Sequence, residues 1–74
     1  MVDEFTDTYG DTANVYTHSG RVYLTTVTDP GTRHEANAEL SFTPDEALKY
    51  AKAVKRAAKA GRAHLDRRQR LLGR

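Results

Sequence analysis

Lysine and arginine recur through one segment in the second half of the chain. The segment reads "KYAKAVKRAAKAGR", residues 49–62, and most of its cations lie three or four positions apart with alanine between them. On a helix, this spacing gathers the cations on one side. A rigid row of cations displaces counterions from a nucleic-acid backbone, which predicts phosphate binding. The predicted basic face comprises Lys52, Lys55, Arg56, Lys59, Arg62, Arg67 and Arg70.

The alternative interpretation of the basic face is an ordinary solvated helix surface, because lysine and arginine are good helix formers. The distribution of charge favours binding instead. Residues 1–46 contain nine acidic and two basic residues, a net charge of −7, whereas residues 47–74 contain ten basic residues and one acid, a net charge of +9. Such asymmetry hints at a nucleic-acid, membrane or acidic-protein partner. The face has no asparagine or glutamine to read adenine, so we expect weak sequence preference.

Residues suited to catalysis or metal binding are sparse. His18, His34 and His64 lie in separate segments without the spacing of metal ligands, and the chain contains no cysteine. There is no glycine-rich phosphate loop and no nucleophile elbow. We therefore expect a protein that is not an enzyme and that uses no cofactor or metal.

The length of the chain limits what it can fold into. Seventy-four residues predict a single domain, 1–74, whose core would contribute only about 3–5 kcal/mol, so a partner would help it fold. The acidic start "MVDEFTDTYG" is not typical of a signal peptide, and no apolar run approaches the ~18 residues of a membrane span. The absence of cysteine suits a reducing compartment. We expect a soluble, cytoplasmic protein without a membrane partner.

The stretch "SFTPDEAL" predicts the start of a helix. Thr43 suits the N-cap, Pro44 the first helical position, and Glu46 the carboxylate of a capping box. Helix is expected from 44 to about 60, and the basic tail 62–74 is expected to extend it, because Leu65 and Leu72 stay in phase with an apolar stripe. That apolar stripe comprises Ala47, Tyr50, Ala51, Val54, Ala57, Ala58, Gly61 and Leu65.

Earlier residues alternate with a period of two, which is typical of strands. "ANVYTHSGRVYLTTVT", residues 13–28, predicts a hairpin turning at Ser19-Gly20, with Tyr16 opposite Tyr23. "EANAELSF", residues 35–42, predicts a further strand, and "EFTDTYG", residues 4–10, a short edge strand or a loose segment. The expected fold is α+β: an antiparallel meander of three or four strands within residues 4–42, with one C-terminal helix packed on one face through the apolar stripe.

A second candidate surface lies on the opposite face of the sheet. This outer cluster comprises Tyr16, His18, Arg21 and Tyr23. Aromatic and basic side chains together can stack on bases. The favoured alternative is a cross-strand tyrosine pair that shields the sheet, because Glu35 and Glu39 on the same face would repel phosphate.

The chain resembles short proteins encoded by actinobacteria and their phages. The resemblance rests on "DTYGDTANVY", "GRVYLTTV" and "AELSFTPDEALKYAKAVKRAA", a hairpin followed by a capped strand-to-helix junction. It implies a small accessory protein, and it implies no site residues because those proteins have no assigned activity. The lysine-rich helix departs from their mixed or acidic helix.

Three hypotheses follow from these observations. The first is a non-catalytic module that contacts DNA or RNA backbone through the basic face. The second is a protein-interaction module, such as a phage factor that docks on a host protein. The third is a homodimer formed through the helix, in which the marginal core and the leucines at 65, 71 and 72 are covered by a second copy.

Overall fold

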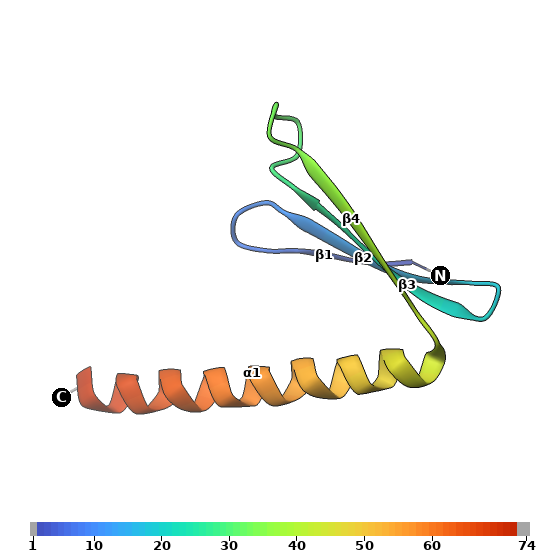
Figure 1. Cartoon of the computed structure of the whole chain (residues 1–74). Helices are drawn as coiled ribbons and strands as arrows, with labels where there is room; N and C mark the ends of the chain where they lie inside the picture. Colours follow the sequence, from blue (N-terminus) through green and yellow to red (C-terminus); the bar gives the residue numbers. More distant parts are fainter. Residues whose placement is uncertain (1, 73–74) are drawn as a thin grey trace.

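The structure is a computed structural model that describes residues 2–72 of the chain. It contains four strands and one helix: β1 (Val2–Thr6), β2 (Thr12–His18), β3 (Arg21–Thr28), β4 (Ala36–Phe42) and α1 (Pro44–Leu72). The strands form one antiparallel sheet in the order β1-β2-β3-β4, followed by the helix (Figure 1). The predicted α+β meander is confirmed, in its four-stranded form.

The β2–β3 hairpin has the predicted turn and register. Ser19 and Gly20 both have positive φ, 51° and 78°, as a two-residue type I′ turn requires. Tyr16 pairs with Tyr23 and Val15 with Leu24. Because side chains alternate along a strand, this register places the two tyrosines on one face of the sheet and the aliphatic pair on the other.

The edge strands add apolar side chains to the face that carries Leu24. Leu40 of β4 pairs with Leu24, and Phe42 pairs with Val22, as the alternation in this strand predicts. The edge strand β1 begins at Val2, before the expected start at residue 4, and its side-chain alternation places Phe5 on the same face as Val15. One sheet face is therefore apolar and turned toward the helix.

Hydrogen bonds at the start of α1 form the predicted capping box. The backbone N–H of Thr43 donates to Glu46 Oε1 at 2.8 Å, and the backbone N–H of Glu46 donates to Thr43 Oγ1 at 3.2 Å. The first helical bond follows, from the N–H of Ala47 to the carbonyl of Thr43 at 2.9 Å. This junction fixes the direction in which the chain leaves β4.

The helix faces the apolar side of the sheet, but only its first turns contact it. From there α1 diverges from the sheet, so that the two form a V (Figure 1). The expectation that the helix packs on the sheet through the apolar stripe is therefore wrong beyond these turns: Val54 is 51% exposed and Leu65 is 63% exposed. The alanines of the stripe have small side chains, which offer little apolar area to hold the helix against the sheet. The length of the helix accounts only for its overhang: the 29 residues span about 43 Å, whereas eight residues of strand span about 27 Å.

As a consequence, the described part of the chain has no buried core. None of its side chains is buried, and the accessible surface of 6559 Å² exceeds by about 2,000 Å² the roughly 4,600 Å² typical of a folded monomer of 8.3 kDa. The radius of gyration, 16.1 Å, also exceeds the value of about 11 Å expected for a compact domain of this length. Within residues 2–72, no helix is long and apolar enough to cross a membrane.

Candidate nucleic-acid interface

The residues of the basic face all lie on α1, and all of them are exposed. With a rise of 1.5 Å per residue, the face extends about 27 Å along the helix axis from Lys52 to Arg70. The structure brings Arg67 and Arg70 onto the same helix as Lys52, because α1 continues to Leu72. Residues 73–74 of the predicted basic tail lie outside the described residues.

The basic face points away from the sheet. At about 100° per residue, Val54, which faces the sheet, lies about 200° around the axis from Lys52. Lys59 lies close to Lys52 on this projection, whereas Lys55 and Arg62 flank the face on one side. The centre of the basic face therefore lies opposite the side of the helix that carries Val54.

Most acidic residues of the sheet and its loops lie elsewhere, although Asp3, which pairs with Val15, is on the helix-facing side of the edge strand β1. Glu39 pairs with Thr25, a register that places it on the outer face, away from α1. Asp7 Oδ1 accepts hydrogen bonds from the backbone N–H groups of Tyr9 and Asp11, and Glu35 Oε1 accepts one from the N–H of Gly31. These loops close the end of the sheet that is far from the start of α1 (Figure 1).

The pKa of the Glu46 carboxyl group, in the first turn of α1, is lower than usual. Hydrogen bonding to Thr43, first through its backbone N–H and then through its hydroxyl, lowers the pKa of Glu46 below its ordinary value. The positive charges of Arg21 and Lys49 act in the same direction. Glu46 is therefore ionised at neutral pH and also complements the positive end of the helix dipole.

The outer cluster is assembled on adjacent strands, as the register predicts, and its geometry is that of a sheet surface. The rings of Tyr16 and Tyr23 stack with centroids 5.3 Å apart and an interplanar angle of 13°. The guanidinium of Arg21 donates to Ser41 Oγ at 2.7 Å and to the Ser41 carbonyl at 3.2 Å. His18 pairs with Arg21 at the end of β2. Because Arg21 is bonded to β4, the cluster braces three strands.

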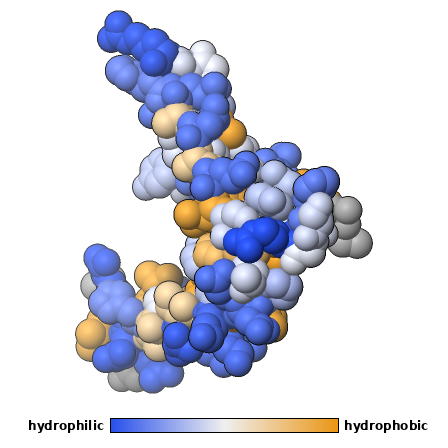
Figure 2. Space-filling view, turned by 45° about the vertical axis from the view of Figure 1, so that its right-hand side comes forward, coloured by the Kyte–Doolittle hydropathy of each residue, from blue (hydrophilic) through white to orange (hydrophobic). Residues whose placement is uncertain are grey.

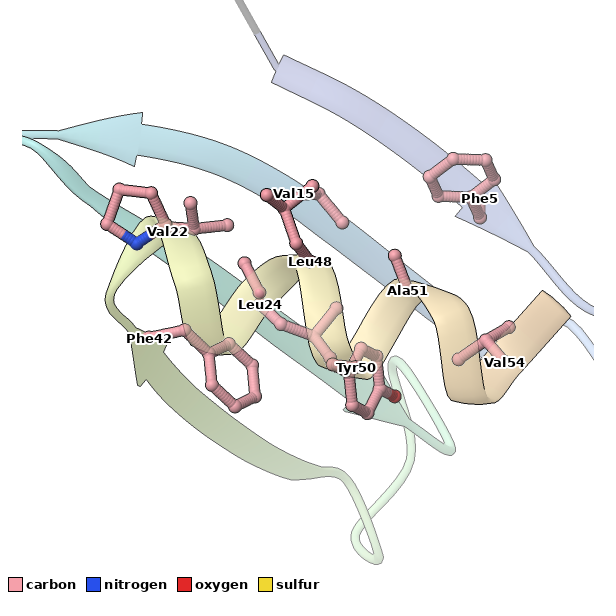
Figure 3. Close-up of a pocket in the computed structure, with 11 residues that line it drawn as sticks. Phe5, Val15, Val22, Leu24, Phe42, Leu48, Tyr50, Ala51 and Val54 are labelled. Carbon is pink, nitrogen blue, oxygen red and sulfur yellow. The ribbon is translucent and has the colours of Figure 1, made fainter. Parts of the chain in front are cut away.

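An open apolar groove, which the sequence reasoning missed, lies between the sheet and the first turns of α1. Its volume is about 650 Å³. Its lining comprises Phe5, Val15, Val22, Leu24 and Phe42 from the sheet and Pro44, Ala47, Leu48, Tyr50, Ala51 and Val54 from the helix (Figure 3). At one end the rings of Phe42 and Tyr50 stack with centroids 5.4 Å apart. In Figure 2, apolar atoms gather where the sheet meets the helix.

Two signals in the sequence bear on the groove. The alternation in β1 indicates an inward-facing Phe5, although the sequence alone leaves this segment open between a short edge strand and a loose segment. The apolar stripe identifies the helix wall, although the stripe was expected to close against the sheet. The sequence therefore identifies most of the lining residues without revealing that the space between them is open.

In the part of the chain that the structure describes, no group of three or more histidine, aspartate or glutamate side chains is arranged to hold a metal ion. His18 lies at the end of β2, His34 in the β3–β4 loop and His64 on α1. Comparison of the chain with protein-family models, with curated proteins and with solved structures finds no match.

Proposed function

We propose that this protein is a non-catalytic binding module that contacts the backbone of DNA or RNA through the basic face of α1. The observation that carries the proposal is the position of this face: it is exposed along a rigid helix and turned away from the sheet. A phosphate backbone can approach it without meeting the carboxylates of the sheet loops. The proposal places the protein in the cytoplasm, where it has access to nucleic acid.

The dimensions of α1 suit this role. An α-helix with its side chains is about 10–12 Å wide, and the major groove of B-DNA is about 12 Å wide. Cations near the centre of the basic face, such as Lys52 and Lys59, and cations at its edge, such as Arg62, point in directions that differ by up to about 80°. A helix lying along a groove can therefore direct cations toward phosphates on more than one side. The proposed contacts are to phosphate, which carries little sequence information.

A salt titration tests this proposal. The intact chain is titrated into a fluorescent duplex of about 20 base pairs, and anisotropy is followed at about 50 and 200 mM salt. We expect binding that weakens steeply with salt and differs little between unrelated sequences, because counterion release supplies the free energy. Binding that is undetectable at the lower salt concentration, or insensitive to salt, contradicts the proposal and favours a protein partner.

Substitution of the basic face makes the test specific. Replacing Lys52, Lys55 and Lys59 together by glutamine keeps helix propensity and removes three cations. The log–log salt slope should fall by up to about 2.7, since each contact with B-DNA contributes about 0.9. Arg33→Gln, in the β3–β4 loop, is the control and should leave the slope unchanged. A fall in slope for Arg33→Gln that is about one third of the fall for the triple replacement would show that net charge, rather than the basic face, governs binding, because the control removes one cation and the triple replacement removes three.

A further inference from the structure

The apolar stripe of α1 extends beyond the apolar groove, and there it has nothing within residues 2–72 to pack against. Ala58 and Leu65 lie C-terminal to the last groove residue, Val54, on the same side of the helix. Leu65 is 63% exposed. The exposed apolar surface therefore runs from the sheet, across the groove, and along most of the helix. A continuous exposed apolar surface is typical of an interface.

We infer that the apolar groove and the apolar stripe are covered by a second copy of this chain, in a two-fold symmetric dimer. The stripe of each helix covers the groove of the other copy, and the two stripes contact each other. In such an arrangement the same patch is used on both copies. This inference concerns a surface other than the basic face and does not depend on nucleic-acid binding.

The area that is exposed matches what an obligate dimer buries. Each chain exposes about 2,000 Å² more than a folded monomer of its mass. Covering all of this excess on both copies would bury about 4,000 Å², and covering half of it would bury about 2,000 Å²; both values are within the range of roughly 2,000–5,000 Å² that obligate homodimers bury. A small apolar ligand of suitable size for the groove would leave Leu65 and the remainder of the stripe in water.

The composition of the stripe also suits a second copy of α1. Ala57, Ala58 and Gly61 are small, so two helix axes can approach closely there, while Leu65 extends far enough to reach the neighbouring copy. An antiparallel pairing opposes the two helix dipoles and spreads the two basic faces over opposite outer surfaces. The cations then remain exposed in the dimer.

The first experiment measures the mass of the intact chain. Sedimentation at micromolar concentration in about 0.5 M NaCl screens charge interactions and leaves apolar burial in place. We expect twice the chain mass of 8.3 kDa, and a thermal unfolding midpoint that rises with protein concentration, because association stabilises the folded state. A monomer, or an assembly larger than a dimer, overturns the inference.

Matched variants locate the interface. Ala58→Lys with Leu65→Lys places two cations on the stripe, whereas Ala60→Lys with Leu71→Lys makes the same replacements on another side of the same helix. Leu71 lies about 120° around the helix axis from Leu65, so the proposed interface, unlike the homodimer expected from the sequence, leaves Leu71 outside. In an isolated chain all four positions are exposed, so neither pair should alter folding. In the proposed dimer, the first pair should weaken association by at least about tenfold, because ammonium groups must leave water. The second should change it by less than about twofold.

Each outcome of this comparison is decisive. Selective dissociation of the Ala58/Leu65 variant supports the dimer, whether the released chain stays folded or loses structure. Equal effects of the two pairs, or a stronger effect of the Ala60/Leu71 pair, overturn the assignment of the interface to the stripe. Failure of the anisotropy experiment would leave this result untouched, because the mass is measured without nucleic acid.

Discussion

At the scale of single residues, Glu46 makes the stability of the chain dependent on pH. Its pKa is lowered in the folded state, chiefly by hydrogen bonding to Thr43. A group with a lowered folded-state pKa stabilises the fold above its ordinary pKa, about 4.3 for glutamate, and this contribution is lost as the pH falls through the lowered value. We therefore expect helix content and the unfolding midpoint to fall on acidification below about pH 5, as measured by circular dichroism.

The matched control for this prediction is Glu46→Gln. A glutamine side chain can still accept the N–H of Thr43 in a capping box but does not titrate. The difference in unfolding midpoint between the two proteins should be largest at neutral pH and should shrink as the pH falls, since the other carboxylates titrate in both. A difference that is constant across this range would show that the charge on Glu46 contributes nothing to the fold.

At the scale of elements, the β2–β3 turn depends on one glycine. Gly20 has a φ of 78°, which costs an L-residue with a side chain roughly 1 kcal/mol or more. Gly20→Ala should therefore lower the free energy of unfolding by about 1 kcal/mol, measured by denaturant titration at one fixed protein concentration. Ser19→Asn is the control, because asparagine is favoured at this position of a type I′ turn. Equal destabilisation by both changes would indicate a general intolerance of this hairpin to substitution.

The elements differ in how far the sequence predicts them. The turn at Ser19-Gly20, the pairing of Tyr16 with Tyr23 and the capping box at Thr43 are local, and short-range sequence signals determine them. The angle between α1 and the sheet is not local. It depends on how much apolar area the helix and the sheet can bury against each other, and periodicity carries no information about that area. The open groove therefore went unpredicted although the periodicity identified most of its lining residues.

The same distinction applies to the candidate surfaces. Membership of the basic face follows from the helical period, so the sequence is sufficient to place Lys52 and Lys59 on one side of α1. The sequence also predicts that Tyr16 and Tyr23 share a face, but it does not reveal that Arg21 is hydrogen-bonded to Ser41 of β4. That contact joins residues 20 positions apart in the chain. It favours a bracing role for the outer cluster over a binding role.

At the scale of the whole molecule, two surfaces occupy different sides of one helix. The basic face carries charge that salt screens, whereas the groove and the stripe are apolar and respond little to salt. Ionic strength should therefore affect nucleic-acid binding and self-association differently. Binding weakens as salt rises, whereas the dimer persists, because salt screens the repulsion between its two like-charged copies. The two surfaces can thus be disabled one at a time.

The variant in which Lys52, Lys55 and Lys59 are replaced by glutamine tests this separation directly. It should remain a dimer at micromolar concentration, with an association constant equal to or higher than that of the unaltered chain, because six fewer cations repel each other in the pair. The same preparation should bind a duplex weakly at low salt. Sedimentation and anisotropy on one sample measure both properties. If the variant is monomeric, these lysines contribute to association, and the helix has one shared surface in place of two.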